Sequence, residues 1–186
     1  MSATAARLAT SVAVGAALVL GLTGAATASA PSREAKATAC TGTELRPTLV
    51  HGTDADPDPE AVQTTALLLF TNVGERTCTV QGYPGLDLVD ADGEAWSMAR
   101  QQGKAEKVTL KPGVATMAEL TFLPVSPGSS APDEEAFVPV SVKVTPPDTT
   151  RTTTLSWPWK DIAVLDQTGS GRPGTYIGTV FGTASS

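Results

Sequence analysis

The chain has 186 residues, with 13 Lys and Arg against 19 Asp and Glu, and its formal net charge is −6 at neutral pH. An acidic chain without a cluster of basic residues is a poor binder of nucleic acid and of anionic lipid, because both are polyanions. We therefore expect no nucleic-acid partner, and we read the acidity as favouring solubility.

Residues 1–30 have the pattern of a secretory signal peptide. One cation, Arg7, precedes the apolar run Val12–Leu22, which is shorter than the ~20 residues that span a bilayer. Small residues at 28–30 form an A-x-A site, so cleavage is expected after Ala30. We expect a secreted, extracellular protein, either free or associated with the cell wall, that does not insert into the membrane after cleavage.

The remaining residues suit one domain with one core. Residues 31–39 are polar and small, and we expect them to form a disordered lead-in. We predict a single β-sandwich domain over residues 40–182, a monomer, and no cofactor.

Two cysteines, Cys40 and Cys78, occur in the chain. In an exported protein the simplest interpretation is one disulfide, which would close a loop of about 39 residues and contribute about 4 kcal/mol in the chain-entropy model. The alternative is a pair of free or metal-bound thiols, but a metal site needs more ligands than a chain with one histidine offers. Lipidation of Cys40 is disfavoured, because the polar stretch PSREAKAT separates it from the apolar run.

Strand signals recur along the rest of the chain, bounded by Gly, Pro, Asn and Asp. The stretch EAWSMARQQGKAEK, residues 94–107, is the best candidate for a helix, although Gly103 interrupts it. The expected strands and hairpins are Leu45–His51 with Pro47 at a sheet edge, Val62–Asn72 buried on both faces or central in a sheet, 77–80, a hairpin over 86–96 with Asp92 and Gly93 at its tip, a strand pair over 106–125 that turns at Pro112, a hairpin over 137–157 with Val138, Val140, Val142 and Val144 on one face, and final strands over 161–167 and 174–182.

About ten short strands at regular turn spacing, with almost no helix, are typical of an antiparallel β-sandwich. We predict the Ig-like version of this all-β fold with one disulfide. A jelly roll or a small barrel is the alternative.

The stretch FTNVGERTCTVQGYPGL, residues 70–86, is explained by structural needs alone. Asn72 and Gly74 end one strand, Cys78 begins the next, and Gly82–Gly85 reverse the chain. Tyr83 is expected to pack its ring at the rim of the core and to bond its hydroxyl to the backbone.

At this stretch the chain resembles the secreted actinobacterial domain catalogued as domain of unknown function 4232. That family shows an N-terminal cysteine before a leucine-containing strand, an F-T-N-x-[GS]-x-x-x-C-x-[VL]-x-G-[YF]-P-G block, a V-T-L-x-P-G turn and a V-x-P-P-[DN] segment. The matching residues are Cys40 to Leu45, Phe70 to Gly85, Val108 to Gly113, and Val144 to Thr149. The resemblance implies export, an immunoglobulin-like sandwich and a Cys40–Cys78 bridge, but no activity. Many members look to have a second cysteine pair in the C-terminal half, and Trp157, Pro158 and Trp159 are expected to hold that half here by packing.

Catalytic chemistry finds little support in the sequence. A Ser-His-Asp site needs a histidine base, and the single histidine, His51, is expected to face solvent at the end of an edge strand. A G-x-S-x-G elbow is absent. Carboxylates that could hydrolyse a glycoside gather at Asp87, Asp90, Asp92 and Glu94, but a hairpin tip favours the same residues. We predict that the protein is not an enzyme.

Two candidate binding sites remain, each with a simpler structural interpretation. Asp54, Asp56, Asp58 and Glu60 alternate in one loop and form a weak calcium candidate, but the EF-hand pattern is missing and a solvated acidic loop is favoured. Trp157 and Trp159 would share one face of an extended segment, where they could stack on a sugar or anchor a partner, together with Tyr83. Core packing is the favoured role for the tryptophans, and more so for Trp96.

These observations favour a secreted, non-catalytic binding or surface module for a protein or a cell-envelope glycan. One alternative is a secreted hydrolase of extracellular polymers. Another is a secreted inhibitor of a protease or a similar partner, which would present a rigid loop such as 126–135 or 167–176.

Overall fold

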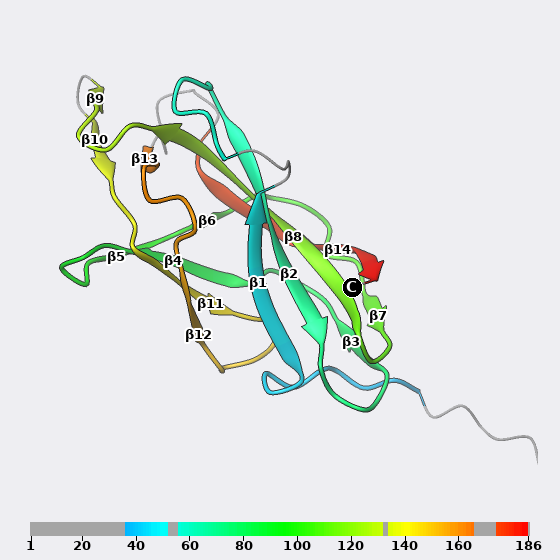
Figure 1. The fold of residues 1–186 in the computed structure, drawn as a ribbon. Coiled ribbons are helices and arrows are strands. Elements are labelled where there is room, and N and C mark those ends of the chain that lie inside the picture. The colour runs from blue at the N-terminus through cyan, green and yellow to red at the C-terminus, as the bar shows by residue number, and fades with distance from the viewer. Residues whose placement is uncertain (1–35, 52–55, 132–133, 166–173, 186) are drawn as a thin grey trace, which may run out of the picture. The chain divides into compact units, whose positions relative to one another are not determined.

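Alternating apolar and polar residues give β-strands from Leu45 onward in the described part of the computed structural model (Figure 1). The structure describes residues 36–51, 56–131, 134–165 and 174–185, which belong to one unit. These described residues contain strands and turns but no helix. They also contain no helix with the length and hydropathy that crossing a membrane requires.

The larger sheet is organised around the long strand β8, Val114–Val125. Strand β2 pairs with β8 on one side, β14 pairs with it on the other, and β13 pairs with its last residues. All pairs in this sheet are antiparallel except that of β14 with β6. The other strands of this sheet are β1 (Leu45–His51), β2 (Thr64–Asn72), β6 (Ala99–Arg100), β9 (Ser130–Ala131), β10 (Glu134–Phe137), β13 (Ala163–Leu165) and β14 (Tyr176–Ser185).

The smaller sheet has four antiparallel strands in the order β12-β11-β4-β5. Its strands are β4 (Gly85–Val89), β5 (Ala95–Ser97), β11 (Ser141–Thr145) and β12 (Thr153–Ser156). A separate antiparallel pair joins β3 (Cys78–Val80) to β7 (Val108–Leu110).

The core lies between the two sheets, because one face of each supplies its fully buried side chains. Strands β2 and β8 contribute Phe70, Leu120 and Phe122, while β4 and β11 contribute Leu88 and Val142 to the same apolar cluster. This face-to-face arrangement is a sandwich, and no sheet closes into a barrel in the part of the chain that the structure describes. The prediction of an antiparallel sandwich with one disulfide is therefore confirmed.

Strands β1 and β2 lie close to where the sequence placed them. Strand β1 spans Leu45–His51 as predicted, and it is an edge strand in which Pro47 costs no ladder hydrogen bond. Strand β2 is central between β1 and β8, but only one of its faces is fully buried. Leu67 and Leu69 on the other face are half-buried.

The best candidate for a helix in the sequence, residues 94–107, is not helical. The segment instead makes β5 and β6 around the buried Met98, whose N–H donates to the carbonyl oxygen of Leu86. Beyond β6, the N–H of Gln101 donates to the Ile177 carbonyl oxygen. Partners from two distant strands thus satisfy the backbone, and they outweigh a weak local preference for helix.

The four valines predicted to share one face are split by a crossing of the chain. Val142 and Val144 of β11 are fully buried, whereas Val138 is 39% exposed and Val140 is 50% exposed. Residues 138–140 carry the chain from β10 in the larger sheet to β11 in the smaller one, so the strand alternation restarts at β11. Two valines are consequently left on the surface.

The predicted disordered lead-in is ordered where the structure describes it. The N–H of Thr79 donates to the Thr38 carbonyl oxygen, and the N–H of Cys40 donates to the Thr79 carbonyl oxygen. Ala39 forms a parallel bridge with Thr79. Residues 31–35 lie outside the described residues, and so does most of the 168–174 loop.

Candidate functional site

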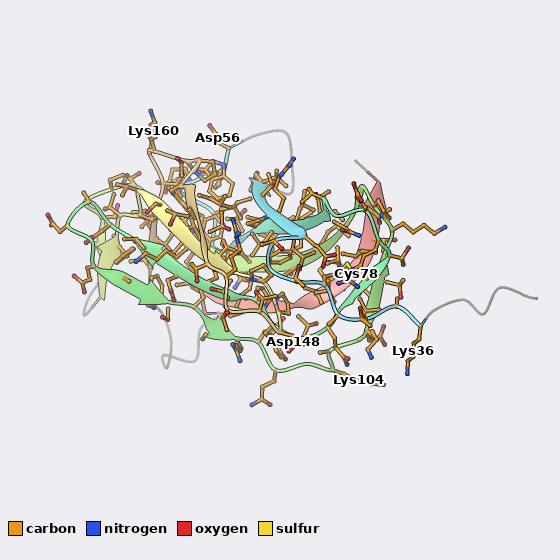
Figure 2. All side chains as sticks on the ribbon, turned by 90° about the horizontal axis from the view of Figure 1, so that it is seen from below. Lys36, Asp56, Cys78, Lys104, Asp148 and Lys160 are labelled. Carbon is orange, nitrogen blue, oxygen red and sulfur yellow. A yellow bond between two sulfur atoms is a disulfide. The ribbon has the colours of Figure 1, made fainter. Side chains whose placement is uncertain are left out.

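The Cys40–Cys78 disulfide is formed, with an S–S distance of 2.03 Å. Both cysteines are buried, and the prediction of a bridge is confirmed over the alternative of free or metal-bound thiols. Figure 2 shows Cys78 toward the end of the unit where Lys36 lies. Because the sulfur of Cys40 is bonded to Cys78, it is not available to carry a lipid thioether.

Asn72 is the last residue of the F-T-N motif, residues 70–72, and its side chain is completely buried. Its Nδ2 donates to the carbonyl oxygens of Arg76 and Leu110, at 2.9 and 3.1 Å, and its Oδ1 accepts the N–H of Gly74 at 3.0 Å. One amide thus closes the turn after β2 and ties it to β7. This motif is a structural device, as the sequence indicated.

Arg76 fastens the N-terminal segment beside the disulfide. Its guanidinium contacts both carboxylate oxygens of Glu44, at 2.7 and 2.8 Å, and also donates to Thr38 and to the Ala39 carbonyl oxygen. The hydrogen bond from Arg76, with one from the Thr41 backbone, lowers the pKa of Glu44 to about 2. Sequence reasoning missed this ion pair, since 32 residues separate its members.

Tyr83 takes the structural position that the sequence indicated. Its hydroxyl donates to the carbonyl oxygen of Gly103 at 3.0 Å. The guanidinium of Arg100 lies 5.8 Å from the centre of its ring, within the range of a cation–π contact. The ring therefore already has an intramolecular partner.

Trp157 and Trp159 are both buried, with 4% and 5% of their surface exposed. Their rings pack edge to face at 4.8 Å, and each lies 5.7 Å from the ring of Phe122. The indole N–H of Trp157 donates to the Ile162 carbonyl oxygen. In this arrangement the tryptophans fill one end of the core and offer no open ring face to a sugar.

His51 is half-buried rather than facing solvent as expected. Its Nε2 lies 3.1 Å from the hydroxyl oxygen of Thr64, and its ring packs edge to face on Trp159 at 5.6 Å. The imidazole thus caps the tryptophan cluster.

The acidic loop proposed for calcium is only partly described, because Asp54 lies outside the described residues. Asp56, Asp58 and Glu60 are exposed, and Asp58 accepts the backbone N–H of Glu60 through its own carboxylate. Figure 2 shows Asp56 near Lys160, far from Cys78. No three His, Cys, Asp or Glu side chains converge as metal ligands within the described residues.

The other acidic residues shape the hairpin that joins β4 to β5. The carboxylate of Asp90 accepts the backbone N–H groups of Asp92 and Glu94, and Gly93 adopts a φ of 88°. This turn is the predicted one, at the predicted tip. Asp87 lies away from it and accepts the hydroxyl of Ser97.

A groove of about 470 Å³ lies between this hairpin tip and the segment that crosses from β10 to β11. We call it the acidic groove; its lining residues are Asp90, Ala91, Asp92, Glu94, Ala136, Phe137, Val138 and Val140. One wall carries three carboxyl groups, and the other is apolar. Phe137 is supported from behind by Trp96, at 5.8 Å between ring centres.

Sequence reasoning did not find this groove. It noted the acidic turn and the four valines separately, and it gave each a structural role. The acidic and aliphatic residue types of the two walls were visible in the sequence, but their proximity was not. About 45 residues separate the walls, and no local pattern brings them together.

A comparison with protein families matches residues 40–178 to the model described as Domain of unknown function (DUF4232). The match includes the disulfide, the FTN motif, Tyr83 and both walls of the acidic groove. No curated protein and no solved structure matched the chain. With three quarters of its length matched, the chain belongs to the family of domain of unknown function 4232.

Proposed function

We propose that this protein is an exported, non-catalytic binding module that recognises a macromolecular partner at the acidic groove. The observation that carries the proposal is the exposure of Val138 and Val140 beside Phe137, in a hollow large enough for several side chains. Exposed aliphatic groups that share one concave surface are a common mark of recognition sites.

The residues considered for catalysis support a binding role over a chemical one. His51 is engaged with Thr64 and Trp159, both cysteines are bridged, and the carboxylate of Asp90 organises its own turn. A hydrolase remains the alternative to test. If the protein cleaved wall glycans or peptides, and Asp92→Ala abolished the cleavage, the proposal would be wrong.

Export follows from the signal-peptide pattern and agrees with the use of a disulfide. We expect intact-mass measurement to find a chain that begins at Pro31 and weighs two hydrogens less than its reduced form. This chain should occur in the medium or in the wall fraction. A chain that kept residues 1–30 inside the cell would contradict this part of the proposal.

The groove is tested by panning the exported form, residues 31–186, against a random peptide display library and an array of wall glycans. The groove variant is Val138→Ser with Val140→Ser, and the matched control is Val62→Ser with Val73→Ser, which also replaces two exposed valines. Each lost aliphatic contact is worth about 1 kcal/mol, so the groove variant should weaken selected binders by about tenfold or more.

The control variant should leave the same binders within about twofold. Binders that ignore the groove variant would contradict the site, and so would a complete lack of binders. Inhibition of an extracellular protease that titrates at one-to-one stoichiometry, and that survives the groove variant, would favour the inhibitor alternative.

A further inference from the structure

We propose that the element recognised at the acidic groove is a polypeptide segment with Lys or Arg side chains next to aliphatic ones. This inference rests on the proposed binding function and names the partner's chemistry. Among the described residues that line the groove, three are acidic and none is basic. The electrostatic potential of the site therefore favours a cation.

Two of the acidic groups are free to meet such a cation. The side-chain carboxylates of Asp92 and Glu94 make no hydrogen bond and no ion pair with any described residue, and both residues are exposed. The Asp90 carboxylate, in contrast, accepts two backbone N–H groups. A ligand cation beside Asp92 and Glu94 would gain charge pairs without breaking any within the protein.

The opposite wall matches the rest of a basic side chain. Lys and Arg carry long aliphatic stems that pack on apolar surface while the charged end reaches outward. Val138 and Val140 offer that surface, and the carboxylates of Asp92 and Glu94 line the other side of the same groove. An aliphatic residue next to the basic one would cover the second valine and the Phe137 ring.

A glycan fits this surface less well. Sugar recognition by aromatic stacking needs an open ring face, and Phe137 is the one aromatic side chain among the described lining residues. Its ring already packs on Trp96 at 64° between the ring planes. The two valine side chains have no polar atoms to bond with hydroxyl groups, and an anionic polymer would be repelled by the carboxylates.

The net charge of the chain, −6 over its full length, acts in the same direction at long range. It attracts a cationic segment and speeds the encounter, and this effect is screened by salt beyond about 8 Å at physiological ionic strength. Binding should therefore weaken as salt rises. The apolar contacts should leave a residual affinity that salt does not remove.

The experiment uses residues 31–186 and a library of capped 12-residue peptides in which net charge and aliphatic content vary independently. Peptides with both Lys or Arg and Leu, Ile or Val should be enriched. Affinities are read from tryptophan emission, since the half-buried Trp96 contacts the groove residue Phe137 while the other two tryptophans are buried. A Trp96→Phe variant should remove the signal.

Charge-matched variants separate the groove from the general acidity of the protein. Asp92→Asn with Glu94→Gln should weaken the enriched peptides by about three- to tenfold and flatten their salt dependence. Glu75→Gln with Glu119→Gln removes the same charge from exposed residues outside the groove and should leave the affinity within about twofold. An equal loss in both variants would show diffuse attraction and overturn the inference.

The remaining outcomes distinguish this inference from the proposed function. If neutral or acidic peptides are enriched, and the Val138→Ser, Val140→Ser variant loses them, the groove binds but the cationic partner is wrong. The same holds if only glycans bind in a groove-dependent way. If no ligand depends on the groove, both the function and its partner are overturned.

Discussion

Asn72 provides the sharpest test of how the fold is held together. Replacing it by Leu removes an amide that makes three hydrogen bonds in a completely buried position. The carbonyl oxygens of Arg76 and Leu110 would lose their donor, and the Gly74 N–H would lose its acceptor. Leu has the same number and branching of side-chain heavy atoms as Asn, so the change tests chiefly the polar contacts.

The loss is estimated bond by bond. A buried polar group left without a partner costs about 1–3 kcal/mol. The bond to the Leu110 carbonyl oxygen is buried, and the other two are partly buried, so we assign about 2–3 kcal/mol to the first and about 1 kcal/mol to each of the others. The apolar Leu side chain returns about 1 kcal/mol, which leaves a net loss of about 3–4 kcal/mol.

Urea unfolding of residues 31–186, followed by far-UV circular dichroism, measures this loss. With a slope of about 1.5–3 kcal/mol per molar, the midpoint should fall by about 1–3 M. The control is Thr71→Val on the neighbouring, outward-facing position of the same strand, which should stay within about 0.5 kcal/mol of the wild type. A loss below about 1 kcal/mol for Asn72→Leu would refute the argument that this amide joins the β2 turn to β7.

The Asn72→Asp variant adds a second test, because its stability should depend on pH. The carboxylate keeps the acceptor for Gly74 but faces two carbonyl oxygens, so its pKa should be raised. A raised pKa in the folded state gives stability that is present at low pH and lost as pH rises. The difference in stability between Asn72→Asp and Asn72→Leu should therefore shrink or reverse below about pH 4. A difference that does not change with pH would contradict the proposed contacts.

Three further predictions concern the ion pair of Arg76 with Glu44, the disulfide, and the tryptophans at one end of the core. Because the folded pKa of Glu44 is lowered to about 2, the wild type should lose stability as pH falls from about 4.5 to 2, and Glu44→Gln should lose less over that range in acid unfolding curves; parallel curves would contradict the role of Arg76. Replacing Cys40 and Cys78 together by Ser should cost about 4 kcal/mol by the loop-entropy model, measured by urea unfolding, and a loss below 1 kcal/mol would contradict it. Trp157→Phe should cost about 1–3 kcal/mol in the same assay, because the Ile162 carbonyl oxygen loses its hydrogen-bond donor. Binding at the acidic groove should not change.

Features that depend on neighbours in sequence were predictable. Leu45–His51 forms a strand, and Gly93 turns a hairpin, because alternation of side chains and the backbone freedom of glycine act over a few residues. With only two cysteines in the chain, their pairing followed from composition alone. Tyr83 bonding to backbone also followed, since a half-buried phenol needs a partner.

Features that depend on distant neighbours were not predictable in the same way. The 94–107 segment has the composition of a weak helix, and its backbone pairing with the distant strands β4 and β14 decides that it is extended. The exposure of Val138 and Val140 depends on where the chain crosses between sheets, which the alternation of the valines does not record.

The amino-acid sequence by itself therefore determined the class of fold, the bridge and most of the turns, because each rests on local preference or on simple counting. The tertiary structure alone decided that the tryptophans are buried and that an acidic turn faces exposed valines. The physical reason is that burial and surface complementarity are properties of residues brought together by the pairing of sheets. Such contacts between distant segments leave no period in the sequence.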